Sequence, residues 1–519
     1  MKDEYNDEDI ARGIDLGTTN SCLAVLRNNK VEIIPKEIGE NLTPSVVSFI
    51  DEGQLVGENS FNQLIINPKN TIYSIKRIIG RDFNEIEDDI NSHFWNFDII
   101  KLKNEVKPKI KIIKKGGDID YYTPEQISSI ILRKLLKSAN DYLGRPVSKA
   151  IITVPAYCNN SQRESTKNAA ILANIEVLNI VNEPTAASLA YGLDKRIPKK
   201  EDNEIDLLKN PKERKINKEN NNINIINTIN ENKNKNLILV FDLGGGTFDV
   251  TLLEINEGED FIVLSTSGDS HLGGDDFNKK IMDYCLEHFC TQFNFKENEI
   301  KKDPLAMNRL RIASENAKIC LSYEEETSIT LEDFYKNETL NIKSFTKVKF
   351  EEICNDLFSK LIHPLDKVLD DAHKGPTDVN EIVLVGGSTR MPQIKEIIHN
   401  YFINIQLNIN DYINPDETVA YGAAILAAKL MRQGTDILND IIILDIIPFS
   451  IGIGIHNGSE IPEIKNEGLL MSIIIPKRKK IPCSKTVENY RTVEDFQRKG
   501  HIPIYEGENK YVKYNHFLG

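Results

Sequence analysis

Residues 239–253 read LVFDLGGGTFDVTLL. An apolar run ends at Asp242, three glycines and Thr247 follow, and a second apolar run resumes. The pattern predicts two strands joined by a tight turn, because glycine reaches backbone conformations that other residues avoid. Residues 13–26, GIDLGTTNSCLAVL, repeat the arrangement around Asp15. The sequence therefore carries a duplicated strand–turn–strand unit.

Both turns have the chemistry of a phosphate-binding loop. Glycines let backbone N–H groups approach an anion, and Thr18, Thr19 and Thr247 add hydroxyl donors. Asp15 and Asp242 would repel phosphate directly, but they suit a Mg²⁺ ion that keeps its waters between carboxylate and phosphate. Neither turn fits the GxxxxGK[ST] loop, because no lysine follows and the next element has the pattern of a strand. Two ordinary hairpin turns are the alternative, which the duplication makes less favourable.

Length and composition describe a globular protein with several domains. The chain has 519 residues, of which 40% are hydrophobic and 27% charged, and this suits a sizeable core. A formal net charge of −14 argues against a general nucleic-acid or anionic-membrane binder. The seven cysteines lack a CxxC spacing, which favours a reducing compartment over a disulfide framework or a zinc site.

The N-terminus is acidic and has no apolar core, unlike a secretory signal or an Arg-rich transit peptide. No uninterrupted apolar stretch is long enough to span a bilayer. We therefore expect a cytoplasmic protein with no membrane or nucleic-acid partner, while an organellar location stays open.

Strands and helices alternate along most of the chain, which predicts an α/β architecture. Residues 149–157, KAIITVPAY, have the pattern of a buried strand. Ser161, followed three residues later by a glutamate, has the form of a capping box that opens a helix. Residues 414–430 predict another helix, with Asn414 as N-cap and Pro415 at the first helical position.

Two segments interrupt this alternation, and a third follows it. Residues 195–236 are dominated by Asn, Lys and Glu and predict a solvated, unstructured insertion, with an Asn-rich binding segment as the alternative. Residues 437–447 hold a short apolar run between Asp440 and Asp445, which predicts one more buried strand or an interdomain linker. Residues 448–519 are rich in β-branched residues, Pro and Gly, and predict a β-rich module.

The sequence resembles the 70-kilodalton heat-shock chaperones, the DnaK-like family, along most of its length. Besides the two turns, the matching motifs are NPKNTIYSIKRIIGR (67–81), ITVPAYCNNSQRESTKNAA (152–170), NEPTAASLAYGLDK (182–195), GDSHLGGDDFN (268–278), RLRIASENAKICLS (309–322), VLVGGSTRMP (383–392) and INPDETVAYGAA (413–424). The resemblance implies an α/β, actin-like ATPase fold of two lobes around a nucleotide cleft in residues 1–436. A linker at 437–447 and a truncated β-sandwich substrate domain at 448–519 would follow.

The resemblance also implies roles for residues at the matching positions. Asp15 and Asp242 would hold Mg²⁺ through water. The implied catalytic residues are Lys76, Glu183, Asp249 and Thr247. A cation beside the γ-phosphate can orient water and stabilise developing charge, whereas the carboxylate that takes the proton is left open. The implied nucleotide contacts are Gly17, Thr18, Thr19, Asn20, Gly244, Gly245, Gly246, Thr247, Gly273, Gly274, Glu315, Lys318, Ser322, Gly386, Gly387, Ser388, Arg390 and Asp416.

One helical face is expected to meet the adenosine. Glu315, Lys318 and Ser322 are spaced i, i+3 and i+7, so a helix would carry all three on one face. The resemblance places residues 386–390 on the opposite wall, while a plain amphipathic helix remains the alternative for the first group. Ile319 stands where the family has an arginine that stacks on adenine, and because isoleucine can still pack on the ring we expect binding to survive.

The implied activity is that of a molecular chaperone with a slow ATPase. Its cofactors would be ATP or ADP and Mg²⁺, with K⁺ as an optional further ion. Its partners would be unfolded or apolar client peptides and nucleotide-exchange factors. A nucleotide-dependent scaffold or a non-chaperone ATPase remnant is one alternative. A sugar or glycerol kinase of the same superfold is another, and the linker and the NEPTAA and GDSHLGG stretches argue against it.

Coupling between nucleotide and client is expected to pass through a relay and the linker. Pro155 and Arg163 match a proline switch and a nearby arginine of the family. Asp440, Leu444 and Asp445 belong to an apolar run flanked by acidic residues. Such a run can bury against one lobe in one state and be released in another.

Three departures from the family modify these expectations. Asn160 replaces an aspartate, so an interdomain hydrogen bond would persist while a charge is lost. Asn179 replaces an arginine that recruits J-domain cochaperones, which puts J-domain stimulation in doubt because a charge-assisted contact becomes neutral. Residues 505–519 resemble the middle of the family's sandwich, so we expect an unpaired edge, no helical lid and impaired peptide capture.

Overall fold

The computed structural model describes residues 10–36, 39–92, 94–194, 235–256, 260–403, 408–410, 414–433, 441–455, 469–488, 490–491, 496 and 498–519. The expected insertion at 195–236 lies outside these residues except for 235 and 236, which begin a strand, and Asp440 lies outside them as well.

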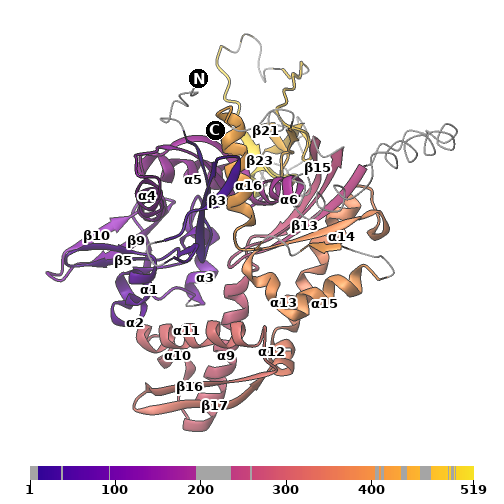
Figure 1. Ribbon diagram of the computed structural model, residues 1–519. Coiled ribbons are helices and arrows are strands. Elements are labelled where there is room, and N and C mark those ends of the chain that lie inside the picture. Colours follow the sequence, from indigo (N-terminus) through magenta and orange to yellow (C-terminus); the bar gives the residue numbers. More distant parts are fainter. Residues whose placement is uncertain are drawn as a thin grey trace, which may run out of the picture.

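Two six-stranded sheets form the centres of two lobes (Figure 1). The first has the order β12-β11-β1-β2-β3, with β4 paired to β2. Its strands are β1 (Arg12–Asp15), β2 (Asn20–Arg27), β3 (Lys30–Ile33), β4 (Leu42–Pro44), β11 (Lys149–Val154) and β12 (Glu176–Asn182). The second has the order β19-β18-β13-β14-β15-β20. Its strands are β13 (Lys235–Leu243), β14 (Phe248–Asn256), β15 (Asp260–Asp269), β18 (Glu381–Val385), β19 (Asn408–Asn410) and β20 (Ile442–Leu444).

The duplication in the sequence is a duplication in the fold. The strands β1 and β2 form an antiparallel hairpin, as do β13 and β14. Each hairpin has a parallel strand beside its first member, β11 beside β1 and β18 beside β13. The two glycine-rich turns therefore occupy equivalent positions in the two sheets.

Helices and smaller sheets surround these two centres. The helices are α1 (Glu58–Phe61), α2 (Gln63–Ile66), α3 (Glu87–Asn91), α4 (Pro124–Leu143), α5 (Asn160–Leu172), α6 (Glu183–Asp194), α9 (Gly274–Phe293), α10 (Glu297–Ile300), α11 (Pro304–Cys320), α12 (Lys347–Ile353), α13 (Asn355–Lys360), α14 (Ile362–Asp371), α15 (Pro392–Tyr401) and α16 (Thr418–Leu430). The smaller sheets are β6-β5-β7 (Gly53–Val56, Val47–Ile50, Thr71–Ile72), β10-β9-β8 (Ile119–Tyr122, Pro108–Ile113, Asp98–Lys101) and β16-β17 (Glu326–Tyr335, Glu338–Thr346). None of the described helices combines the length and the apolar character needed to cross a membrane.

The helix α5 begins with a different cap from the one the sequence suggests. Asn159 is the N-cap: its side chain accepts a hydrogen bond from the N–H of Gln162 at 2.9 Å, and the Gln162 side chain accepts one from the N–H of Asn159 at 3.0 Å. The predicted box of Ser161 and Glu164 is therefore wrong. The Ser161 hydroxyl donates instead to the distant Gly80 carbonyl at 2.6 Å, a contact that local spacing cannot reveal.

The helix α16 begins at Thr418, four residues after the predicted N-cap. The carbonyl of Asn414 accepts hydrogen bonds from the N–H groups of Glu417 and Thr418, which closes a turn before the helix. The Pro415 carbonyl accepts from the Gly386 N–H at 3.1 Å. The segment that was expected to open the helix thus ties it to the glycine pair after β18.

The helices α6 and α16 cross in the seam between the lobes, where one apolar cluster contains residues from both six-stranded sheets. Gly422 lies at this crossing, and a Cβ atom there would sit 1.7 Å from the Ala186 carbonyl oxygen. The two helices approach this closely only because the position carries no side chain.

We expect Gly422→Ala to lower the free energy of unfolding by about 1–3 kcal/mol, because the added methyl group must push the α6 backbone away. Urea unfolding measures the change. Gly116→Ala is the matched control, since nothing lies within 4 Å of a Cβ at that position. A Gly422→Ala protein with the wild-type unfolding midpoint would show that the crossing is looser than described.

The C-terminal region begins with a strand that belongs to the second lobe. Residues 442–444 form β20, which pairs in parallel with the edge strand β15, and Ile442 is 52% exposed. The described part of 448–519 contains strands and a single 3₁₀ turn but no α-helix. Its sheet has the order β22-β21-β23-β24 and is built from β22 (Leu470–Ile475), β21 (Ile451–Ile455), β23 (Ile504–Glu506) and β24 (His516–Phe517). The run of residues 437–447, predicted as a strand or a linker, thus supplies a docked edge strand that leads into a separate sheet.

Candidate functional site

A cavity of about 370 Å³ lies between the lobes and is lined by both glycine-rich turns. The first turn contributes Asp15, Gly17, Thr18, Thr19 and Asn20, and the second contributes Asp242, Gly244, Gly245 and Thr247. The structure therefore brings together two turns that are more than two hundred residues apart in the sequence.

The turns touch each other, which requires bare backbone. A Cβ atom on Gly245 would lie 2.0 Å from the Thr19 hydroxyl, and one on Gly246 would lie 2.8 Å from the Thr18 hydroxyl. A Cβ atom on Gly273, at the start of α9, would lie 2.6 Å from the backbone of Gly245. Gly246 and Gly273 do not line the cavity themselves. Their role in the geometry is to let three backbone segments pack together beneath it.

Two aspartates, Asp15 and Asp242, line the main cavity, and a third, Asp249, lies beside it. Burial and then the charge of Glu183 raise the pKa of Asp15 to about 7, and the same two causes raise the pKa of Asp249 to about 7. Burial and neighbouring carboxylates also raise the pKa of Asp242, whose Oδ2 atom has no hydrogen-bond partner among the described residues. An orphaned carboxylate oxygen in an acidic cavity is a site that a hard cation would satisfy.

The geometry favours a water-mediated cation over one held directly. Within the described ranges, no group of three His, Cys, Asp or Glu side chains is placed to hold a metal ion. Asp15 and Asp242, one from each lobe, line the same cavity. Mg²⁺ usually keeps several of its waters and takes only one or two carboxylates, so the donor set fits Mg²⁺.

Lys76 supplies the positive charge at the deep end. Its Nζ atom lies 2.5 Å from Oε1 of Glu183, the first residue of α6, and both side chains are almost fully buried. Burial alone would lower the pKa of Lys76, but the charges of Glu183 and Asp15 outweigh it and leave the pKa raised. The ammonium group is therefore charged at any physiological pH.

Asp249 lies beside this cavity and not in it. It lines a second, much smaller cavity of about 20 Å³, which shares Lys76 and Thr247 with the first. Its Oδ1 atom accepts a hydrogen bond from the Tyr157 N–H at 3.2 Å. Lys76 and Thr247 thus line both the main cavity and the pocket that holds the Asp249 carboxylate.

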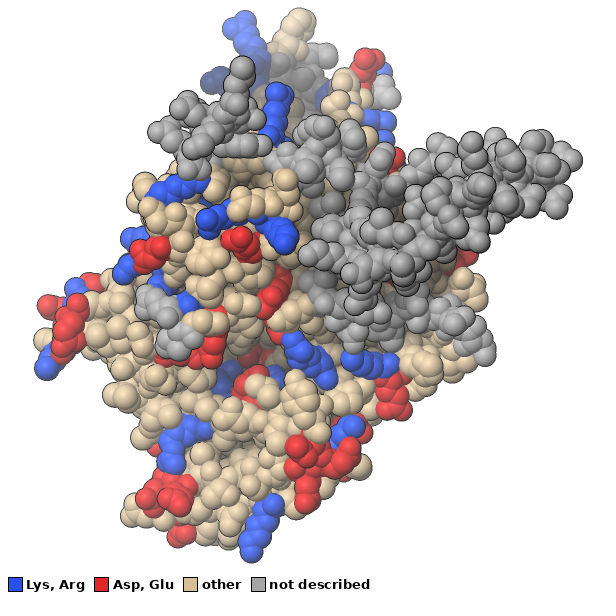
Figure 2. All heavy atoms as spheres, viewed as in Figure 1, with Lys and Arg blue, Asp and Glu red and all other residues tan. Residues whose placement is uncertain are grey.

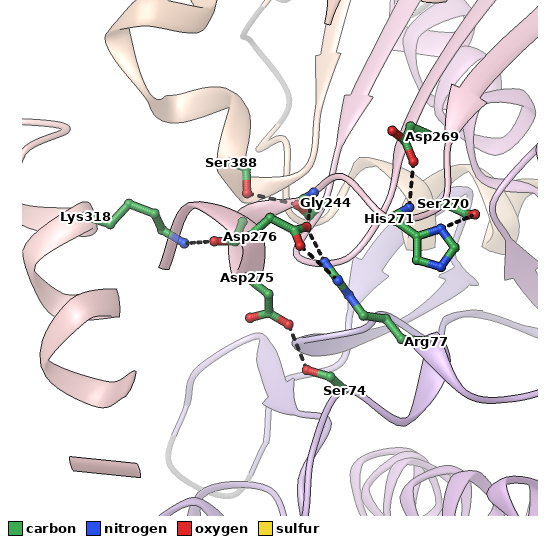
Figure 3. A network of polar contacts seen from close by, with 12 residues as sticks. Ser74, Arg77, Gly244, Asp269, Ser270, His271, Asp275, Asp276, Lys318 and Ser388 are labelled. Atoms are coloured by element: carbon green, nitrogen blue, oxygen red, sulfur yellow. Dashed lines mark hydrogen bonds and ion pairs between the residues drawn. The ribbon is translucent and has the colours of Figure 1, made fainter. Parts of the chain in front are cut away.

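The opposite end of the main cavity is lined by the residues predicted to meet the adenosine. They are Glu315, Lys318, Ser322, Gly386, Gly387, Ser388, Arg390 and Asp416. The Lys318 ammonium donates to the Gly274 carbonyl at 3.0 Å, and the Ser388 hydroxyl donates to the Gly244 carbonyl at 2.9 Å (Figure 3). Ser322 lies beyond the end of α11, so the helical-face prediction is correct for Glu315 and Lys318 but wrong for Ser322, which reaches the cavity from the following turn.

A set of contacts between the lobes closes one side of the site, and the sequence pattern does not predict these contacts (Figure 3). The Ser74 hydroxyl donates to Asp275 at 2.8 Å. Arg77 makes a two-pronged ion pair with Asp276, at 3.1 and 2.5 Å. Each contact joins the segment around Lys76 to the first turn of α9, which lie about two hundred residues apart. Tyr323 and Asp275 also line the cavity without having been predicted, although Tyr323 directly follows Ser322.

A chain of hydrogen bonds leads from the α5 region to the C-terminal segment. The Arg163 guanidinium donates to the Asn182 side-chain oxygen at 2.6 Å and to the carbonyl of Ala156, the residue after Pro155. The Asn182 amide and the Thr185 hydroxyl each donate to Oδ2 of Asp445 at 2.9 Å. Leu444, the preceding residue, is partly buried in β20. The hydrogen bonds therefore connect Arg163 with Asp445 through Asn182, while Asp440 lies outside the described residues.

Two of the departures noted in the sequence have a structural outcome. The backbone N–H of Asn160 donates to Oε2 of Glu506 in the C-terminal sheet at 2.9 Å. This contact uses the main chain, so it does not depend on the missing aspartate. Asn179 is exposed on β12, and its side chain accepts from the neighbouring Ile180 N–H at 2.9 Å. Its neutral amide leaves this surface without the charge that an arginine would provide.

Charged side chains of both signs are mixed on the visible face of the molecule (Figure 2). Lys and Arg alternate with Asp and Glu there, and neither sign forms an extended field.

Comparison with known proteins gives one consistent result. The family model described as Hsp70 protein matches residues 11–519. Heat shock cognate 70 kDa protein 3 of Dictyostelium discoideum is 40% identical over 508 residues, which cover 98% of this chain and 72% of that protein. Heat shock 70 kDa proteins of Neurospora crassa and Emericella nidulans are 41% and 40% identical over 511 residues, covering 98% of this chain and 70% of each relative.

Proposed function

Because the chain belongs to the Hsp70 family, a family of ATP-dependent chaperones with an actin-like ATPase fold of two lobes, we propose that its interlobe cavity binds and hydrolyses ATP. The predicted family, fold class and general function are confirmed by the match over nearly the whole chain. The proposal rests on one observation: two glycine-rich turns meet around a cavity that holds Lys76, Asp15 and Asp242.

Hsp70 proteins bind ATP or ADP, generally with Mg²⁺. In this chain Asp15 and Asp242 would hold the ion through water, and the ion would offset phosphate charge. The threonines and the backbone of Gly244 and Gly245 would contact the phosphates. K⁺ as a further ion stays a prediction.

We assign a separate role in hydrolysis to each of Lys76, Glu183 and Asp249. Lys76, which lines the cavity, would stabilise negative charge that develops on the γ-phosphate. Glu183 holds the Lys76 ammonium at 2.5 Å and so fixes its direction. Asp249 accepts the proton of the attacking water: the water oxygen bonds to the γ-phosphorus, the bond to the bridging oxygen breaks, and ADP leaves. A carboxyl whose pKa is about 7 is well matched to that task.

This assignment predicts a pH dependence. The basic form of Asp249 exists above its pKa, so the hydrolysis rate should fall as the pH drops through about 7 and level off above it. Single-turnover hydrolysis at saturating ATP and Mg²⁺, between roughly pH 5.5 and 8.5, measures this. Asp249→Asn should be slow at every pH. A sloping profile that persists in Asp249→Asn would assign the titration to another group.

The contact between the turns predicts a loss of nucleotide affinity in Gly273→Ala. The new methyl group would press on the Gly245 backbone and displace the phosphate-facing turn. We expect ATP to bind roughly tenfold or more weakly, since overpacking costs about 1–3 kcal/mol. Calorimetric titration of ATP into Gly273→Ala and into the control Gly116→Ala measures the effect. Equal affinities would mean that this packing does not shape the site.

Hsp70 proteins bind unfolded client peptides and cochaperones. For this chain we propose apolar peptides and nucleotide-exchange factors as partners, and the neutral Asn179 makes J-domain stimulation weaker than an arginine would. Impaired peptide capture, a cytoplasmic location and the boundaries at 436 and 447 stay predictions.

A further inference from the structure

The main cavity is chemically different at its two ends. Lys76 and the buried aspartates lie at one end, and Ile319, Tyr323 and Arg390 line the other. A nucleoside triphosphate is elongated, with all its charge at one end and an aromatic base at the other. If the triphosphate lies on the glycine-rich turns, as the proposed function requires, the base must reach the end that carries Ile319 and Tyr323.

These two side chains form an apolar surface that faces the cavity. Ile319 is 50% exposed and Tyr323 is 73% exposed, which is unusual for large apolar groups that share a concave site. The Tyr323 N–H donates to the Cys320 carbonyl at 3.0 Å, so the chain continues in a turn beyond α11. Ile319 lies in the last turn of α11 and Tyr323 in the turn that follows, and both side chains line the cavity.

A flat cation, the Arg390 guanidinium, lines the same cavity as this surface. The Arg390 guanidinium donates to Asp416 at 2.8 and 3.3 Å and to the Asn414 side-chain oxygen at 2.7 Å, which fixes its plane. The hydrogen bond to Asp416 is the largest cause of the raised pKa of Arg390, and the Tyr323 phenol adds to it. The phenol therefore lies near the guanidinium, and both flat groups line the cavity.

We propose that Tyr323, with Ile319 beside it, forms a stacking wall for the purine base of the bound nucleotide, and this rests on the proposed function. Aromatic rings and guanidinium groups both stack on nucleobases, and a two-ring purine offers more area than a pyrimidine. Tyr323 is thus a specificity residue of the ATP site. It makes up for the missing cation at position 319 by supplying a ring from the turn that follows α11.

The test compares ligands that have the base with one that lacks it. Calorimetry gives the affinities of ATP, CTP and inorganic tripolyphosphate, each with Mg²⁺, for wild type, Tyr323→Ala and Tyr323→Phe. We expect Tyr323→Ala to bind ATP roughly tenfold more weakly, to bind tripolyphosphate as wild type does and to discriminate less between ATP and CTP. Tyr323→Phe keeps the ring and should stay within about twofold of wild type. Tyr121→Ala, which alters a half-exposed tyrosine of β10 outside the cavity, is the matched control.

Each other outcome has a clear meaning. Wild-type ATP affinity in Tyr323→Ala overturns the stacking wall and leaves the ATP site standing. Equal losses for ATP and tripolyphosphate assign Tyr323 a structural role and also overturn the wall. A wild-type protein that binds tripolyphosphate but prefers no base overturns it too. A wild-type protein that binds neither ligand overturns the proposed function itself.

Discussion

Lys76→Ala is expected to lose nearly all hydrolysis of ATP while still binding it. The single-turnover rate should fall roughly 10²–10³-fold, the size of effect seen when one preorganised charge is removed from a transition state. Affinity for ATP should fall far less, because both glycine-rich turns and Arg390 remain in place.

The buried position of Lys76 is the physical reason for so large an effect. Its ammonium is held by Glu183 at 2.5 Å in a site shielded from water, where a charge acts at low dielectric. Water that enters the space left by alanine cannot supply a fixed positive charge. Lys69→Ala is the matched control, because Lys69 lies on the same segment but pairs with Asp98 at the surface. A Lys76→Ala protein that hydrolyses ATP at the wild-type rate would show that the catalytic cation is elsewhere.

Asp445→Ala is expected to release the docked strand β20 from the second lobe. One buried carboxylate oxygen accepts two hydrogen bonds, from Asn182 and Thr185, both at 2.9 Å. Hydrogen bonds to a charged group contribute about 1.5–3 kcal/mol each, so the docking equilibrium should shift by at least roughly tenfold. Stimulation of ATP hydrolysis by an apolar peptide should be lost with it, because this segment joins the C-terminal sheet to the two lobes.

Hydrogen exchange of the amides at 442–444 measures the docking. These amides should exchange at least about tenfold faster in Asp445→Ala than in wild type. Asp445→Asn keeps an acceptor and should give an intermediate rate. Asp120→Ala, which removes a surface ion pair with Lys114, is the control. Unchanged exchange in Asp445→Ala would mean that pairing with β15 alone holds the strand.

The features that the sequence predicts correctly are those that local pattern controls. The two hairpins follow from apolar runs broken by glycines, and their equivalence in the two sheets follows from the repeat. The sequence predicts the ends of helices less well, because these ends depend on hydrogen-bond partners that lie far away in the sequence. Ser161 bonds to Gly80 and does not cap α5, and the Pro415 carbonyl is used by Gly386.

In the site, too, local motifs predict which residues are present, whereas contacts between distant segments are not predictable from the sequence. The motifs predict most of the residues that line the cavity, because each turn or helix holds its own side chains in position. The contacts of Ser74 and Arg77 with the start of α9 were not foreseen, because they form only when the lobes meet. Tyr323 was missed because exposure, which marks it as unusual, is not visible in a sequence. The roles of the individual site residues remain predictions for the experiments above.

Calorimetric titration of the wild-type protein with ATP tests the central proposal most directly. With Mg²⁺ present, we predict saturable binding of a single ATP per chain. When EDTA removes the ion, binding should weaken strongly, because buried aspartates then face the phosphates without a cation. Absence of any binding heat, or an affinity that does not change when Mg²⁺ is removed, would contradict an ATP site built on Asp15, Asp242 and the two glycine-rich turns.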